Sequence, residues 1–191
     1  MEKAYDDIMN IVVIAIIPIL ERGKTLFMFV NEADGALRFP GGKVKQRESL
    51  IEALQREIFE ETGMKTITAT TIMMIEHSLR YDLKNDEIKK SILLYFFLAS
   101  FRETISMDED PRYKWMDNDL VASRLKLIPY DNHLIINDLA KITKDHGYMV
   151  SPGFLDSPNG KEMIEIRYFC WIDPELQESS SWDAYLQQHD D

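Results

Sequence analysis

Three glutamates in this 191-residue chain have a spacing that suits metal chemistry. Glu57, Glu60 and Glu61 stand at positions i, i+3 and i+4, which places their carboxylates on one face of a helix. Like charges at this spacing destabilise a helix mildly unless cations neutralise them. Carboxylate oxygens suit Mg²⁺ or Mn²⁺, and Mg²⁺ binds substrate phosphates together with one or two carboxylates. A solvated acidic face explains the triplet equally well, so its neighbours must decide.

The residues around the triplet favour the metal-site hypothesis. A Pro-Gly-Gly run at 40–42 gives a loop with few side chains, where backbone groups can approach a ligand closely. Arg56 is adjacent to Glu57 and can hold the orientation of that carboxylate through charge-assisted hydrogen bonds. Arg38 and Lys43 flank the loop and can pair with substrate phosphates, although exposed charges of this kind are common.

The segment from Gly42 to Met64 resembles the Nudix box, G-x5-E-x7-R-E-U-x-E-E-x-G-U with U apolar, at all nine defined positions. At typical residue frequencies, a chance match in a chain of this length has a probability on the order of 10⁻⁷. The strand and Phe39 before the box are similar to the usual Nudix layout. So are Trp115-Met116 and Asp119-Leu120 after it, and the resemblance covers roughly residues 8–145.

The resemblance implies a Mg²⁺-dependent pyrophosphohydrolase, with Mn²⁺ as an alternative ion. The family's metal-binding carboxylates are matched by Glu57, Glu60 and Glu61. The backbone carbonyl of Gly41 matches a further metal ligand, and Glu57 also matches the candidate general base. Arg56 and Glu48 match residues that orient the cluster. The implied reaction is attack of a metal-activated water on phosphorus, with the ion also stabilising charge on the diphosphate oxygens.

The substrate class and the general base are less well defined. The resemblance implies a nucleoside diphosphate linked to another group: a nucleoside triphosphate, a dinucleoside polyphosphate or a nucleotide sugar. Tyr81, seventeen residues after Met64, resembles a marker of dinucleoside polyphosphate hydrolases and is a candidate substrate-binding residue. Many relatives carry an acidic group just before the tryptophan, where this chain has Arg112-Tyr113-Lys114. The acidic residues that remain open as base or further ligand are Glu103, Glu109 and Asp110.

The sequence speaks against three other functions. A Nudix-fold module that senses a ligand without turning it over has no need of a complete glutamate triplet. Isomerase chemistry of the isopentenyl diphosphate type uses a cysteine in the fold's core, whereas Cys170 lies far outside it. RNA decapping is disfavoured by the net charge of −11, from 22 Lys plus Arg against 33 Asp plus Glu. The same charge speaks against any general nucleic-acid partner.

The remaining composition suggests a cytoplasmic enzyme of small molecules. A single cysteine excludes an intrachain disulfide and suits a reducing compartment. The apolar run Ile11–Leu20 is interrupted by Pro18 and is half as long as the roughly twenty residues that a membrane span needs. The acidic first ten residues do not resemble a signal peptide. We therefore expect a nucleotide-like substrate and no membrane partner.

The order of the predicted elements indicates an α/β (α+β) fold with a mixed β-sheet sandwiched between helices, as in the Nudix fold. A capping box at Ser49 and Glu52 begins the clearest helix, and Gly63 ends it. A second helix is expected at about Asp131–Lys144. The expected strands are Ile11–Leu20, Thr25–Val30, Ala36–Phe39, Thr66–Glu76 and Ile88–Phe101.

The pattern changes beyond about residue 145, which predicts a Nudix domain over 8–145 and a C-terminal extension over 146–191. Strands at Tyr148–Leu155 and Glu162–Ile172 flank Asn159-Gly160, a strong signal for a hairpin turn. The end of the chain is expected to be a polar tail or a short helix around Trp182–Gln188. We expect the hairpin to cover the substrate cleft or to form a homodimer contact.

Overall fold

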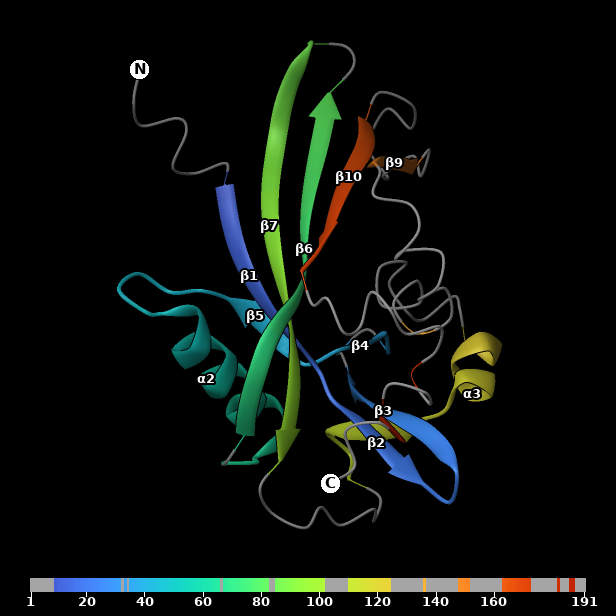
Figure 1. Ribbon diagram of the computed structural model, residues 1–191. Coiled ribbons are helices and arrows are strands. Elements are labelled where there is room, and N and C mark those ends of the chain that lie inside the picture. The colour runs from blue at the N-terminus through green and yellow to red at the C-terminus, as the bar shows by residue number, and fades with distance from the viewer. Residues whose placement is uncertain are drawn as a thin grey trace.

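The protein is described by a computed structural model that contains a six-stranded mixed sheet (Figure 1). The structure describes residues 9–31, 33, 35–65, 67–82, 85–101, 110–124, 136, 148–151, 163–172, 182 and 186–187. Across the larger sheet the strands are β5 (Gly41–Lys43), β1 (Met9–Ile16), β7 (Glu87–Phe101), β6 (Ile67–Asp82), β10 (Met163–Trp171) and β9 (Tyr148–Ser151). β1 runs parallel to β7, whereas the other neighbouring strands are antiparallel. The predicted mixed sheet is confirmed.

A smaller antiparallel sheet lies beside it. It contains β2 (Pro18–Glu21), β3 (Lys24–Asn31), β4 (Leu37–Arg38) and β8 (Tyr113–Met116), and β8 leads into the short helix α3 (Asn118–Ser123). The chain passes from β4 of this sheet to β5 of the larger one through Phe39 and Pro40, both of which are buried. The Ala15 amide donates to the Pro40 carbonyl at 2.8 Å. The Pro-Gly-Gly run is therefore fixed where the two sheets meet.

The predicted strand Ile11–Leu20 is two strands in different sheets, so this prediction was wrong in its continuity. Pairing of β1 with β7 ends at Ile16, and β2 begins at Pro18 and pairs with β3. Proline has no N–H to donate to a ladder, so Pro18 favours a break at this point. The Ile17 carbonyl between the two strands accepts the Met28 amide at 3.2 Å.

The helix α2 (Leu50–Thr62) packs against β1 and β5, on one face of the larger sheet (Figure 1). Both halves of the predicted capping box are present, because the Glu52 amide donates to Ser49 Oγ and the Ser49 amide donates to the Glu52 carboxylate. Gly63 ends the helix with φ 76°, a left-handed conformation that glycine adopts without steric cost. The fully buried side chains that face the sheet are Ala53, Leu54 and Ile58.

The core on the other side of the sheet includes residues from the C-terminal part of the chain. Trp182 is only 3% exposed and meets the Phe27 ring edge-on, with centroids 5.4 Å apart. Ile136 is buried in the same cluster, and both residues are helical. The rest of the predicted helix 131–144 lies outside the described residues. In the described part of the chain, no helix has the length and apolarity needed to cross a bilayer.

The two predicted C-terminal strands are confirmed as β9 and β10, which pair antiparallel. β10 also pairs with β6 from Met163 opposite Asp82 to Trp171 opposite Met74, so the hairpin extends the larger sheet. The prediction for β6 was too short, since the strand continues beyond Glu76 to Asp82. Its polar second half is held between two neighbouring strands, a stabilisation that local sequence does not encode. The predicted turn around Asn159 lies outside the described residues.

Replacement of Trp182 by alanine should destabilise the protein, although the residue lies only nine positions before Asp191. The expected loss is about 3–5 kcal/mol, typical of removing a large buried aromatic side chain. Urea unfolding of parent and variant would measure it. Ile172→Ala is the control, because that side chain is exposed and should cost no more than about 0.5 kcal/mol. Equal stability of the two variants would contradict a core role for Trp182.

Candidate active site

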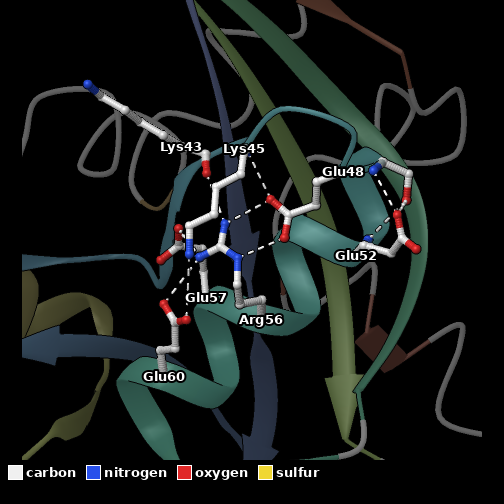
Figure 2. Close-up of polar contacts among 8 residues, drawn as sticks. Lys43, Lys45, Glu48, Glu52, Arg56, Glu57 and Glu60 are labelled. Atoms are coloured by element: carbon white, nitrogen blue, oxygen red, sulfur yellow. Dashed lines mark hydrogen bonds and ion pairs between the residues drawn. The ribbon is translucent and has the colours of Figure 1, made fainter.

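The guanidinium of Arg56 lies at the centre of a polar network between α2 and the preceding loop (Figure 2). Its Nε and Nη2 donate to the two oxygens of Glu48 at 2.7 and 3.0 Å, a bidentate contact. Its Nη1 donates to Glu57 at 2.6 Å and to Glu60 at 3.2 Å, while Nη2 also reaches the Lys43 carbonyl at 3.0 Å. Arginine has five N–H groups, and each of them has an acceptor here. Arg56 therefore acts as a positioning residue.

The partners of Glu48 hold its carboxyl group ionised. Its hydrogen bond with Arg56 is the largest cause, followed by the Lys45 amide, which donates at 2.9 Å. Together they lower the pKa of Glu48 from 4.5 to about 2. The hydrogen bonds that Arg56 donates to Glu48, and then to Glu57, raise the pKa of Arg56 above its ordinary range. Glu48 and Arg56 therefore both stay charged near neutral pH.

Glu57 is placed by the glycine loop as well as by Arg56. The carboxylate lies so close to the Gly42 backbone that a Cβ at this position would overlap it. Since the backbone of Gly42 is not in the left-handed region, steric contact with Glu57 is the constraint that the structure shows on this residue. The glycine loop and α2 are thus in contact through the Gly42 backbone and the Glu57 carboxylate.

Glu61 and Arg38 form the other end of the cluster. The Gly41 amide donates to one oxygen of Glu61 at 2.9 Å, and Arg38 Nη2 donates to the other at 3.3 Å. Gly41 has φ 154°, and a Cβ there would meet the backbone of Val13, so glycine is required for close packing of β5 on β1. Arg38 therefore contacts the glutamate triplet itself.

The lysine side chain that lies near the glutamates is that of Lys45, whereas the sequence suggested Lys43. Lys43 contributes its carbonyl to the Arg56 network, but its side chain is exposed and points away from the carboxylates (Figure 2). Lys45, which the sequence reasoning missed, places its Nζ 3.8 Å from Glu60. Lys45 lies beyond the end of β5, and nothing in the local sequence favours it over Lys43 as a partner of the glutamates.

The three carboxylates of Glu57, Glu60 and Glu61 each face a cation of the chain. In the described residues, no three His, Cys, Asp or Glu side chains converge closely enough to hold a metal ion, because guanidinium groups lie among the glutamates. The donor set is nevertheless suited to a hard divalent cation: oxygens on one helix face, beside glycine backbone that leaves room for no side chain. These residues fit such an ion.

Asp110, one of the three candidates for the general base, is held by Arg112. The Arg112 side chain and backbone amide donate to its carboxylate at 2.7–3.0 Å, and these bonds lower the pKa of Asp110 to about 2. Arg112 in turn lies against Gly63 at the end of α2, where a Cβ would collide with its guanidinium. An acid with this pKa is a poor proton acceptor near neutral pH. Glu103 and Glu109 lie outside the described residues.

Tyr81 is not brought to the glutamates. Its hydroxyl donates to Asp86 in the turn between β6 and β7, and this hydrogen bond is the largest cause of its raised pKa. Tyr81 lies near the turn end of the long hairpin, whereas α2 packs beside the opposite end (Figure 1). Its substrate-binding role stays a prediction, as does that of the exposed Lys43 side chain.

Comparisons with known proteins agree with this geometry. A model of the NUDIX domain matches residues 9–139, well over half of the chain. The 8-oxo-dGTP diphosphatase of Buchnera aphidicola subsp. Schizaphis graminum is 35% identical over 105 residues, which cover 54% of this chain and 72% of the relative. That of subsp. Acyrthosiphon pisum is 35% identical over 104 residues, covering 54% and 76%.

The solved structures that resemble this one are more distant in sequence. An Ap4A hydrolase from C. elegans gives a TM-score of 0.47 at 19% identity, over 63% of this chain and 86% of that one. A MutT protein from Methanosarcina mazei Go1 gives 0.43 at 23% identity, over 64% and 86%.

The matching domain model and the curated relatives show that this chain belongs to the Nudix family, and it is a hydrolase that acts on phosphorus anhydrides. The expectation of an enzyme is confirmed. Nudix hydrolases act on small nucleotide molecules and generally use divalent metal ions.

Gly42→Ala should impair catalysis more than folding. The new Cβ would displace the Glu57 carboxylate, and misplacement of about 1 Å costs on the order of 10²-fold in rate. Steady-state kinetics together with thermal unfolding would separate the two effects. Gln46→Ala, at an exposed position of the same loop, is the control. Activity of Gly42→Ala equal to that of the control would show that the contact with Glu57 does not matter.

The stability of the protein should depend on pH through Glu48. Because folding lowers the pKa of this carboxyl from 4.5 to about 2, its stabilising effect is complete above pH 4.5 and is lost as the pH falls toward 2. Glu48→Gln should therefore be less stable than the parent at pH 7, and the difference should shrink through this acid range. Chemical unfolding at several pH values tests this. Glu21→Gln, which removes a carboxylate at the end of β2 and outside the Arg56 network, is the matched control.

Proposed function

We propose that the chain is a Mg²⁺-dependent pyrophosphohydrolase that splits a nucleoside triphosphate into a nucleoside monophosphate and pyrophosphate. The observation that carries this proposal is the fully bonded Arg56, which fixes Glu57 and Glu60 beside the glycine loop. The triphosphate class is favoured because both curated relatives act on 8-oxo-dGTP. Mg²⁺ is proposed because the donors are carboxylate oxygens, which hard cations prefer.

The proposed metal ligands are the carboxylates of Glu57, Glu60 and Glu61 and the carbonyl of Gly41. When bound, the ion would activate water and stabilise the negative charge that develops on the diphosphate. Glu57 is the proposed acceptor of the water's proton, since Arg56 and Gly42 hold its carboxylate in one place. Arg56 and Glu48 act as positioning residues, because their hydrogen bonds are directed at each other and at the ligands.

The structure adds no support to the dinucleoside polyphosphate alternative, since Tyr81 bonds within its own hairpin. Nucleotide sugars remain an alternative substrate class, because no contact among the described residues distinguishes them from triphosphates. A cytoplasmic location, a homodimer and the division of the chain at residue 145 stay predictions of the sequence.

The proposed activity is tested by phosphate release coupled to pyrophosphatase, at saturating Mg²⁺. The panel contains 8-oxo-dGTP, the ordinary nucleoside triphosphates, dinucleoside polyphosphates, ADP-ribose and nucleotide sugars, with a phosphatase-coupled assay for products that are monoesters. We expect 8-oxo-dGTP or another triphosphate to be turned over best. Glu60→Gln should lose about 10²-fold or more in kcat, because a charged ligand is removed.

Glu21→Gln removes the same charge from the smaller sheet and should retain the parent's activity. Activity that is independent of divalent ions would contradict the proposed metal site. Preference for a dinucleoside polyphosphate or a nucleotide sugar over every triphosphate would replace the substrate class and leave the cluster's role in place.

A further inference from the structure

We propose that Lys45 is a tethered counter-ion of Glu60: a divalent cation replaces its ammonium group at this carboxylate, and the displaced ammonium then binds a phosphate oxygen of the substrate. This role rests on the proposed function, because the ion and the phosphates are those of the diphosphate-cleaving reaction. Lys45 occupies one of the undefined positions between Gly42 and Glu48 in the Nudix box, so the box assigns it no role.

The contact between Lys45 and Glu60 is weak and accessible to solvent. Nζ lies 3.8 Å from Oε1, beyond hydrogen-bond distance, so the two groups attract each other through charge alone. The lysine side chain is 62% exposed and the glutamate side chain 52%. Exposed ion pairs of this kind add little stability. A divalent ion carries twice the charge of the ammonium, so it attracts the same carboxylate more strongly.

The direction of the Lys45 side chain distinguishes it from its neighbour Lys43. Figure 2 shows Lys45 extending alongside Arg56 toward the carboxylate of Glu60, whereas the Lys43 side chain points away from the carboxylates. Lys45 is therefore the loop lysine that an ion on Glu60 would repel directly.

Glu60 keeps a second partner when Lys45 leaves. Its Oε2 accepts Nη1 of Arg56 at 3.2 Å, and Arg56 is only 19% exposed and bound bidentately by Glu48. The guanidinium therefore continues to direct this carboxylate toward the cluster. Replacement of the ammonium changes the charge beside Glu60 without removing the contact that positions it.

The backbone of Lys45 is fixed, so only the side chain has to move. Its amide donates to the Glu48 carboxylate at 2.9 Å, and its carbonyl accepts the Glu48 amide at 3.2 Å. The ammonium thus stays within one side-chain length of its resting position. Two oxygens that bind the same Mg²⁺ are at most about 4 Å apart, so phosphate oxygens sharing an ion with Glu60 would lie within its reach. Lysine binds phosphate as a point charge and needs no fixed orientation.

The test measures metal and anion binding separately, without turnover. Mn²⁺ affinity is measured by electron paramagnetic resonance, which detects the free ion, in phosphate-free buffer for the parent and Lys45→Gln. Affinity for the non-hydrolysable methylenediphosphonate is then measured by calorimetry at saturating Mg²⁺. An ionic strength of about 0.15 M screens distant charges. Arg47→Gln is the matched control, because it removes a cation from an exposed position of the same loop, and Lys45→Arg keeps the charge.

The exchange predicts effects of opposite sign on the two affinities. Lys45→Gln should bind Mn²⁺ about threefold or more tightly than the parent, because the competing ammonium is gone. It should bind methylenediphosphonate about fivefold or more weakly, because a charge-assisted contact is lost. Lys45→Arg and Arg47→Gln should both stay within about twofold of the parent in each measurement.

Both effects of Lys45→Gln are required. Weaker Mn²⁺ binding would mean that Lys45 only holds Glu60 in place, and an unchanged diphosphonate affinity would mean that the ammonium does not reach the phosphates. Equal shifts in Arg47→Gln would trace the effects to the charge of the whole loop. Each of these results overturns the exchange.

The parent protein separates this proposal from the proposed function. If the parent binds Mn²⁺ and Lys45→Gln changes neither affinity, the role of Lys45 is wrong and the proposed metal site stands. A parent that binds no Mn²⁺ overturns the metal site and the exchange together. A parent that binds Mn²⁺ but no diphosphonate overturns the phosphate contact alone. Thermal unfolding of each variant shows whether the fold is retained, and Lys45→Arg shows whether the charge itself is responsible.

Discussion

The guanidinium of Arg56 joins the loop before α2 to the helix itself, and the rest of the cluster is arranged around it. Its Nε and Nη2 groups bind Glu48 and the Lys43 carbonyl on the loop, and its Nη1 binds Glu57 and Glu60 on the helix. Because all five N–H groups have acceptors, the guanidinium has one orientation in which nothing is left unpaired. That constraint fixes the carboxylates more narrowly than helix geometry alone.

The sheets supply the second constraint, because they bring the glycine loop to the helix. β4 belongs to the smaller sheet and β5 to the larger one, so the chain between them crosses at a fixed point beside β1. Gly41 and Gly42 allow this crossing to approach both β1 and the Glu57 carboxylate without a Cβ in the way. The same crossing places Arg38 within reach of Glu61.

The charges of the site are balanced within the chain. Each carboxylate of the triplet meets an arginine or lysine, although the protein as a whole carries a net charge of −11. Close like charges are thereby kept from repelling one another when no metal ion is bound. These ion pairs differ in strength. Arg56 is half-buried and each of its N–H groups has an acceptor, whereas Arg38 and Lys45 contact the cluster from exposed positions.

The sequence by itself determined the features that depend on local geometry. The capping box, the end of α2 at Gly63 and the common face of the three glutamates follow from a helical repeat of 3.6 residues, and the structure has the first two as expected. The Nudix box also pointed to Arg56 and Glu48 as residues that orient the cluster, whereas their bidentate contact with each other came from the structure. A mixed sheet followed from the order of strands and helix.

Only the tertiary structure decided which residues from distant segments meet. Lys45 rather than the Lys43 side chain reaches Glu60, Arg112 lies against Gly63, and Trp182 enters the core. The strand 11–20 is divided between two sheets, and β6 is lengthened by its pairing with β10. These outcomes depend on sheet register and on side-chain directions, which are set by contacts between residues far apart in sequence. A pattern confined to neighbouring residues contains no information about them.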